Sequence, residues 1–238
     1  MEFQFTIIVP VYNEIESLPR LFEYLQAYLK SASLKSCVLL VDDGSVDGSA
    51  SAIEKFCLDQ EDFNCLLFEK NYGKGAALKA AFDHTKTPLL GYLDADLQTH
   101  PEDFELLLPF IKDFGLVTGW RKNRKDTLVK RISSKTGNAV RIFFTHDNIH
   151  DTGCPLKIMH TKYAKKIPMF KGLQRFLPAM ILLQQKEIKE VVINHYPRIE
   201  GESKYNFKNR FLGPLLDCFA YVWIKKSYID YSIKAKHG

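Results

Sequence analysis

Long apolar runs are missing from this sequence, and their absence argues against a membrane-spanning helix. The longest apolar stretch, residues 211–224, is interrupted by Asp217 and is shorter than the ~20 residues that a spanning helix needs. The N-terminus has no basic region before its short apolar run, so we expect no signal peptide. These features predict a cytoplasmic protein that does not cross a membrane by itself.

Cysteine and histidine are too few and too scattered to predict a disulfide framework or a zinc site. The five cysteines are odd in number and include no Cys-x-x-Cys motif, so we expect reduced core residues. Of the seven histidines only His146 and His150 lie four apart, and we do not expect them to bind metal. Internal repeats and flexible linkers are also missing, which favours one continuous domain. With 46% hydrophobic residues among 238, the chain can bury a full core.

Positive charge is concentrated in one segment. The net charge is +5, but residues 112–141 carry nine Lys or Arg and two Asp, a net +7, so the rest of the chain sums to −2. A local basic segment favours an anionic partner that docks at one place, such as a phosphate-bearing substrate, an anionic bilayer or nucleic acid. A merely solvated charged face is the alternative.

Short apolar runs alternate with segments of helical periodicity. Strands are expected at residues 5–9, 38–41, 65–68, 89–93 and 116–118. Helices are expected between them, over residues 15–29, up to residue 57, over residues 76–84 and from Pro101 onward. This alternation predicts an α/β fold with a mostly parallel sheet flanked by helices on both faces. Ligands of such sheets bind outside the carboxyl ends of the strands.

A polar cluster follows each of the first four expected strands. The clusters are residues 10–14, 42–45, 71–75 and 94–96. Because the carboxyl ends of parallel strands meet at one edge, we expect all four clusters on the same rim of the sheet. Turn chemistry explains each cluster alone, but it does not require carboxylates, an aromatic ring and a Gly-flanked lysine to share one rim. The sequence therefore predicts a ligand site there.

The last of these clusters contains two carboxylates separated by one residue. Asp94 and Asp96 follow an apolar run directly, so they emerge together at the end of an expected strand. Oxygen ligands at this spacing suit Mg²⁺ or Mn²⁺, which fill their remaining sites with water and substrate phosphate oxygens. The pair points to a nucleoside diphosphate, although a turn or a helix-capping cluster would use the same residues.

The motifs, taken in order, resemble those of family 2 glycosyltransferases with a GT-A, Rossmann-like fold. The likeness is greatest to the branch that contains dolichyl-phosphate mannose synthase and bacterial polyprenyl-phosphate glycosyltransferases. It runs through residues 9–14 (VPVYNE), 41–45 (VDDGS), 71–75 (NYGKG), 94–98 (DADLQ), 118–121 (TGWR), 130–138, 151–157 (DTGCPLK) and 198–205 (RIEGESKY). No single motif is decisive, but their order and spacing are typical of this family.

The resemblance implies that the rim clusters hold a nucleotide sugar. Tyr12 and Asp43 match positions that hold the nucleobase, and Lys74, flanked by glycines, matches a position near the base or ribose. The resemblance implies that Asp94, Asp96 and Gln98 bind a divalent metal, Mg²⁺ or Mn²⁺. This metal offsets charge on the departing nucleoside diphosphate. The full implied nucleotide-sugar set is Pro10, Tyr12, Glu14, Val41, Asp43, Lys74, Asp94, Ala95, Asp96, Gln98, Arg198 and Lys204.

The same resemblance gives the basic segment a role. Arg121, Lys130 and Arg131 match family residues that grip the acceptor phosphate or the donor diphosphate, and Ser134 can add a hydroxyl donor. The family usually has Arg where Lys130 aligns, so either Lys130 or Arg131 makes the contact. The implied catalytic set is Asp94, Asp96, Arg121, Lys130, Arg131 and Ser134.

The acceptor distinguishes the mechanisms that remain open. A sugar hydroxyl needs a general base to attack at neutral pH, whereas a phosphate monoester is already anionic. We favour inverting transfer of a hexose, from a donor of the GDP-mannose or UDP-glucose type, to a polyprenyl (dolichyl or undecaprenyl) phosphate at the cytoplasmic membrane face. A saccharide hydroxyl acceptor in cell-surface glycan assembly would need Asp96 or Asp151 as base.

Two further classes fit the sequence less well. A nucleotidyltransferase would place a Gly-rich, Arg-containing loop after the first strand, but residues 9–14 contain no glycine. A non-catalytic basic protein that binds nucleic acid would explain residues 112–141 but not the Asp pair, and the segment has no nucleic-acid motif. We therefore expect no nucleic-acid partner.

The C-terminal segment has the composition of an interfacial helix. Apolar side chains over residues 207–226 are flanked by Lys and Arg, although a core helix packing on the sheet would have the same pattern. We expect a catalytic domain over residues 1–206 and an amphipathic helical segment over residues 207–238. Peripheral attachment to the membrane surface through this segment is the prediction, with a separate membrane subunit as the alternative anchor.

Overall fold

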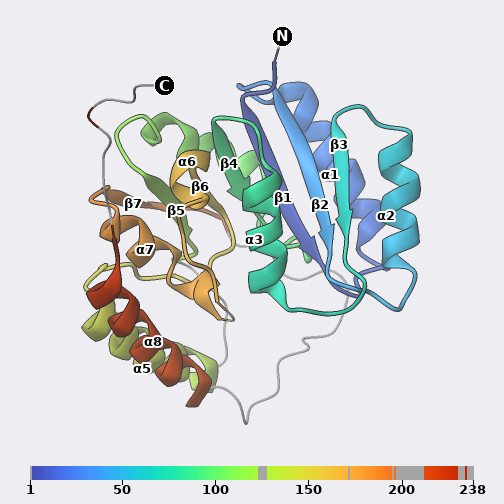
Figure 1. Ribbon diagram of the computed structural model, residues 1–238. Coiled ribbons are helices and arrows are strands. Elements are labelled where there is room, and N and C mark those ends of the chain that lie inside the picture. The colour runs from blue at the N-terminus through green and yellow to red at the C-terminus, as the bar shows by residue number, and fades with distance from the viewer. Residues whose placement is uncertain are drawn as a thin grey trace.

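A seven-stranded sheet lies at the centre of the protein (Figure 1). The structure is a computed structural model that describes residues 2–122, 128–170, 172–194, 196, 212–229 and 234, without the side chains of residues 128–135, 212 and 214. The strand order is β3-β2-β1-β4-β6-β5-β7. The strands are β1 Phe5–Val11, β2 Ser36–Asp42, β3 Phe63–Leu67, β4 Leu89–Tyr92, β5 Leu116–Trp120, β6 Lys157–His160 and β7 Ile188–Val192.

Helices connect the strands and cover both faces of the sheet. The first, α1, begins with Pro19 in its first turn, where a missing N–H costs nothing, and buries one stripe of apolar side chains. The α-helices are α1 Leu18–Ser31, α2 Ser49–Leu58, α3 Lys74–His84, α4 Phe104–Leu107, α5 Leu128–Thr145, α6 Thr161–Ala164, α7 Leu177–Leu183 and α8 Leu212–Ser227. Short 3₁₀ turns are η1 Pro101–Asp103, η2 Leu108–Phe110 and η3 Leu173–Arg175.

The sheet is mostly parallel, as the alternation of strands and helices predicts. The four strands β1 to β4 run parallel in the order β3-β2-β1-β4, so their carboxyl ends share one edge. Strand β6 inserts antiparallel between β4 and β5, and β7 pairs parallel with β5. All five expected strands are confirmed, but β6 and β7 have no counterpart in the sequence prediction. The helix expected from Pro101 begins as η1 and continues as the four-residue α4.

Alternate residues of the central strands build two separate apolar layers. Ile7 and Val9 of β1 pack with α1, α2 and α4 on one face, whereas Ile8 packs with α3, α7 and α8 on the other. In a strand buried on both faces, successive side chains point to opposite layers, so the run is continuously apolar. Each such side chain contributes ~1.5–3 kcal/mol by leaving water. The two layers hold the rim at the strand ends in place.

Helix α8 packs beside α5, and the pair lies at the lower left of Figure 1. Cys218 and Tyr221 of α8 are buried against the second layer, but Phe219 and Trp223 are exposed. The helix therefore does both things that its sequence allows: one face packs on the protein and another presents apolar side chains to the surroundings. Within the ranges that are described, no helix has the length and apolar character needed to cross a bilayer.

Candidate active site

The turns after β1 and β2 are hydrogen-bonded to each other. The backbone N–H of Asn13 donates to Ser45 Oγ at 2.8 Å, and Asn13 Oδ1 accepts from the Val46 N–H at 2.8 Å. The Glu14 N–H donates to Ser49 Oγ at 3.0 Å. Asn13 adopts a positive φ of 51°, which Asn tolerates better than most residues. The first two polar clusters thus meet at the rim as their positions predict.

Asp43 joins the second cluster to the third. Its carboxylate accepts hydrogen bonds from the Tyr72 N–H at 2.8 Å, from the Gly73 N–H at 2.9 Å and from Asn71 Nδ2 at 3.1 Å. Burial raises the pKa of Asp43, and the two backbone N–H groups partly offset that rise. A Cβ at Gly44 would meet the Lys70 backbone at 2.2 Å, so only glycine permits this close approach.

Lys74 and Asp94 join the third cluster to the fourth by an ion pair. Lys74 is the first residue of α3, and Gly73 before it has a φ of 91°. The Lys74 ammonium also lies 5.5 Å from the centre of the Tyr92 ring. Three sets of polar contacts, joined by adjacent backbone, therefore lie along the strand ends from Asn13 to Asp94.

The turn after β4 presents the two carboxylates expected to hold a metal. The Gln98 N–H donates to Asp96 Oδ1 at 3.2 Å, and Leu97 between them has a positive φ of 54°. No group of three or more His, Cys, Asp and Glu side chains arranged for a metal occurs within the described ranges. Two carboxylate donors do fit Mg²⁺ or Mn²⁺, provided that phosphate and water oxygens complete the coordination.

Arg121 is buried next to this rim and is paired with Asp151. Its Nε and Nη2 donate to the two carboxylate oxygens at 2.8 and 3.1 Å, a bidentate arrangement. Burial lowers the pKa of Arg121, but the hydrogen bonds and charge of Asp151 outweigh it and raise the pKa above its usual value. Because the guanidinium occupies both oxygens of Asp151, this carboxylate is poorly suited to act as a general base.

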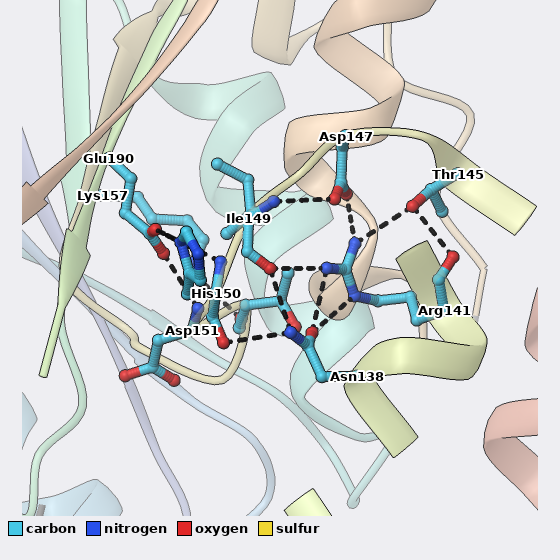
Figure 2. A network of polar contacts seen from close by, with 10 residues as sticks. Asn138, Arg141, Thr145, Asp147, Ile149, His150, Asp151, Lys157 and Glu190 are labelled. Atoms are coloured by element: carbon cyan, nitrogen blue, oxygen red, sulfur yellow. Dashed lines mark hydrogen bonds and ion pairs between the residues drawn. The ribbon is translucent and has the colours of Figure 1, made fainter. Parts of the chain in front are cut away.

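Glu190 of β7 holds the backbone next to the Arg121–Asp151 pair, and sequence reasoning missed it. Its carboxylate accepts from the Asp151 N–H at 2.8 Å and from His150 Nδ1 at 2.7 Å (Figure 2). The His150 ring in turn stacks on Trp120 with 4.5 Å between ring centres. No local pattern marks Glu190, since its partners lie about 40 residues earlier in the chain.

Lys157 is a second buried cation near the rim that sequence reasoning did not single out. It is fully buried and donates to the carbonyl oxygens of Thr152, at 3.3 Å, and Cys154. Its ammonium lies 5.5 Å from the centre of the Tyr92 ring, the ring that Lys74 also approaches. Burial lowers the pKa of Lys157 to about 8, although the nearby anionic groups oppose the shift.

Five further predicted residues occupy the rim in different ways. Tyr12 is 37% exposed beside it, so part of this residue is accessible. Val41 and Ala95 are buried in the apolar layers, so only their backbone could contact a nucleotide. Pro10, which pairs with Val41 across β1 and β2, is half-buried, and Glu14 Oε2 accepts from Ser17 Oγ at 3.1 Å, at the start of α1.

Five predicted residues cannot be placed as side chains. Lys130, Arg131 and Ser134 belong to α5, which is helical as a backbone, but their side chains lie outside the described part. Arg198 and Lys204 lie outside the described residues altogether. Their roles therefore remain predictions from the sequence.

The fold and the rim together define a GT-A-type α/β protein, and the comparisons with known proteins give the family. The family model for glycosyl transferase family 2 matches residues 6–168. This chain belongs to glycosyl transferase family 2.

Two curated relatives are about a third identical to this chain over the aligned residues. A dodecaprenyl-phosphate galacturonate synthase of Rhizobium johnstonii is 31% identical over 215 residues, which cover 87% of this chain and 63% of the relative. An undecaprenyl-phosphate 4-deoxy-4-formamido-L-arabinose transferase of Salmonella paratyphi A is 32% identical over 204 residues, covering 85% and 62%. The chain thus spans somewhat less than two thirds of each relative.

A solved structure shares the fold at low sequence identity. Glucosyl-3-phosphoglycerate synthase from Mycobacterium tuberculosis, in complex with Mn²⁺, UDP-glucose and phosphoglyceric acid, superposes with a TM-score of 0.67 at 13% identity. The match covers 96% of this chain and 81% of that one. This likeness supports the GT-A fold and carries no assignment of individual residues.

Proposed function

We propose that this protein transfers a sugar from a nucleotide sugar to a polyprenyl phosphate, with inversion at the anomeric carbon. The observation that carries the proposal is the polar rim from Asn13 to Asp94, next to the buried Arg121–Asp151 pair. The names of both relatives, which specify a polyprenyl phosphate, support the acceptor class. The donor would be of the GDP-mannose or UDP-glucose type.

The donor would lie along the rim with its base near Tyr12. The partly exposed Tyr12 ring offers a stacking face, and Asp43 fixes the turn that opens α3. The N-terminus of α3, with the free space over Gly73, is suited to an approaching anion. Lys74 adds a positive charge at the same place, so this end of the rim favours a diphosphate.

Asp94 and Asp96 are the residues that would hold a divalent cation, with Gln98 beside them. A bound Mg²⁺ or Mn²⁺ would supply charge neutralisation on the diphosphate as the nucleoside diphosphate departs. The complex of the Mycobacterium tuberculosis structure with Mn²⁺ supports divalent metal use in this fold. Lys74 shares Asp94 and would contribute to the same neutralisation.

A phosphate acceptor suits this site, because it does not require a carboxylate to act as a general base. A phosphate monoester is already anionic and needs positioning rather than deprotonation. Asp151 is held by Arg121, which argues against Asp151 as a base for a hydroxyl acceptor. A phosphate oxygen would attack the anomeric carbon in line, a new carbon–oxygen bond would form, and the bond to the diphosphate would break with both its electrons leaving on the nucleoside diphosphate. One displacement inverts the anomeric centre.

A lipid acceptor requires contact with a membrane surface, and the α5–α8 pair offers one. Among the side chains that the structure describes on these helices, six apolar ones are between 39% and 72% exposed: Val140, Phe143, Leu215, Leu216, Phe219 and Trp223. Lys225 and Lys226 lie in the last turn of α8, where they can meet anionic headgroups. We propose peripheral attachment at the cytoplasmic face through this apolar patch, with residues 1–206 as catalytic domain and residues 207–238 as the attachment segment.

The test is an acceptor panel with radiolabelled GDP-mannose, UDP-glucose and UDP-galacturonate. Each donor would be offered undecaprenyl phosphate, dolichyl phosphate or free oligosaccharides, with Mn²⁺ or Mg²⁺. We expect product only with a polyprenyl phosphate, and with the opposite anomeric configuration to the donor. Transfer to oligosaccharides alone would favour the hydroxyl-acceptor alternative. The absence of metal-dependent transfer to every acceptor tested would contradict the proposal.

A further inference from the structure

Asn138 joins helix α5 to the loop that follows the helix. Its Nδ2 donates to the carbonyl oxygens of Ile149 and His150, both at 3.1 Å. Its Oδ1 accepts from Nε and Nη2 of Arg141, at 3.1 and 2.9 Å (Figure 2). A side-chain amide has two donor hydrogens and one acceptor oxygen with two lone pairs, so these four bonds use its whole capacity.

Arg141 extends the same network one helical turn further. It is buried and forms an ion pair with Asp147, and it donates to Thr145 Oγ1 at 3.2 Å and to the Ile149 carbonyl at 2.8 Å. Removing two charges from water is costly, so a buried ion pair adds little net stability over an apolar replacement. What such a network does supply is a fixed geometry between α5 and residues 146–151.

The loop of residues 146–151 ends at Asp151, which forms the ion pair with Arg121. Asp151 pairs with the Arg121 guanidinium, and Glu190 fixes the Asp151 and His150 backbones from the β7 side. The loop is therefore clamped between α5 and β7, as Figure 2 shows. A hydrogen-bonded path leads from Asn138 through the loop backbone to Arg121.

Helix α5 also carries three residues that the sequence assigns to the acceptor phosphate or the donor diphosphate: Lys130, Arg131 and Ser134. We propose that Asn138 and Arg141 are positioning residues that hold helix α5 and Arg121 at a fixed spacing. The proposal rests on the proposed function, since Arg121 and the start of α5 are the parts assigned to phosphate binding. A displacement of ~1 Å at a reacting group can cost about 100-fold in rate, so a clamp remote from the chemistry can govern turnover.

The test variant is Asn138→Asp, which keeps the shape but replaces two donors by a carboxylate facing two carbonyl oxygens. We expect faster amide hydrogen exchange over residues 146–151 and at Arg121, without change at the Asp43 turn. With wild-type transfer established, we expect kcat/KM for polyprenyl phosphate to fall about 10- to 100-fold and nucleoside diphosphate affinity to stay the same. The matched control is Asn148→Asp, the same change at an exposed position of the same loop.

A double variant separates positioning from a general structural role. If Asn138 acts through Arg121, adding Asn138→Asp to Arg121→Lys should cost much less than it costs the wild type. Full additivity, or unchanged exchange at Arg121 and residues 146–151, would overturn the inference. If Asn138→Asp does not fold, Thr145→Val, which removes one acceptor of Arg141, carries the same tests. Inactivity of the wild type would contradict the proposed function alone, because the exchange measurement would still decide the clamp.

Discussion

Lys74 and Asp94 form an ion pair that ties the first turn of α3 to the turn after β4. Both side chains are about 30% exposed, so solvent screens their attraction, and such a pair contributes only ~1 kcal/mol or less. The main consequence of the ion pair is therefore where it places the lysine charge. A lysine cation sits on one of the two carboxylates that a divalent metal would use.

Replacing Lys74 should therefore shift two affinities in opposite directions. In Lys74→Met, Mn²⁺ should bind the protein alone about fivefold more tightly, because the competing cation on Asp94 is gone. Nucleoside diphosphate, added with saturating Mn²⁺, should bind more weakly, because one positive charge near the phosphates is lost. Titration calorimetry with Mn²⁺, UDP and GDP measures both.

Lys79→Met is the matched control for Lys74→Met. Lys79 forms a similar ion pair with Asp83 in the same helix, but on its exposed side. This variant should change neither affinity. If Lys74→Met weakened both Mn²⁺ and nucleotide binding, Lys74 would be a support for the turn after β4 and not a competitor of the metal.

Asp96→Asn should abolish sugar transfer while leaving the fold intact. The change removes a charged metal ligand but keeps an oxygen that can still accept from the Gln98 N–H. We expect kcat to fall at least ~100-fold, the scale of losing one group that stabilises transition-state charge. Circular dichroism checks the fold, and Asp83→Asn is the surface control. Turnover equal to wild type would remove the argument for a metal at this turn.

Neutralising Lys130 and Arg131 together should impair use of the acceptor. Both residues lie on α5 within the basic segment, and the prediction assigns them to phosphate. In Lys130→Gln/Arg131→Gln the KM for polyprenyl phosphate should rise or kcat should fall, by about 10-fold or more for two charge-assisted contacts. Lys30→Gln/Lys55→Gln removes the same charge from exposed positions on α1 and α2. A double variant that lost only affinity for DNA or RNA, with transfer intact, would show that the basic segment serves nucleic acid.

Lys157 should make stability depend on pH in the alkaline range. Its pKa is about 8 in the folded protein and 10.5 in the unfolded chain, so between these values the unfolded state binds more protons. The free energy of unfolding should therefore rise with pH across this window, by up to about 3 kcal/mol from this group. The burial cost is fully present below pH 8.

The comparison of wild type with Lys157→Met isolates this contribution. Other groups that titrate between pH 7 and pH 10 affect both proteins alike, so the difference between their unfolding free energies should move in favour of the wild type as pH rises. Urea unfolding at intervals across that range measures the difference. Parallel curves would mean that Lys157 has the same pKa in the folded and the unfolded protein, so that burial does not lower it.

The part of the fold that could be predicted is the part with local signals. Continuous apolar runs marked β1 to β5, and the parallel order then brought four separate polar turns to one rim. Strands β6 and β7 were not predicted because their segments, KIMH and IKEVV, contain charged residues that are typical of surface positions. Lys157 in β6 is nevertheless buried, which only the tertiary structure explains.

The predicted site was also incomplete for a physical reason. The resemblance supplied Arg121 and a motif that begins at Asp151, but not the pairing of the two, which are 30 residues apart, nor Glu190, 39 residues beyond Asp151. Contacts between such distant positions leave no periodic or spacing signal. The same limit applies to Asn138 and the loop that it fixes, because hydrogen bonds to backbone carbonyls impose no residue type on the acceptor side.

Attachment to a membrane should depend on the exposed aromatic side chains of α8. Phe219 and Trp223 are 56% and 70% exposed, on a helix whose Cys218 and Tyr221 are buried against the protein. In Phe219→Ser/Trp223→Ser the ring contact of Phe219 with Phe144 is lost but the buried Cys218 and Tyr221 are unchanged, so the fold should persist, while flotation with anionic liposomes should fall strongly. Wild-type binding should weaken with added salt, because each Lys or Arg near an anionic surface contributes only ~1 kcal/mol.

Leu58→Ser provides the control for this membrane prediction, since Leu58 is 82% exposed at the end of α2, outside the α5–α8 patch. If exposed apolar area alone caused flotation, both variants would lose it to a similar extent. If the α5–α8 patch is the attachment surface, only the α8 variant would lose flotation. Phe143→Ser in α5 should then reduce binding further, because Phe143 belongs to the same patch. Wild-type protein that binds neutral and anionic vesicles equally, or binds neither without a second protein, would assign the anchor to a membrane subunit.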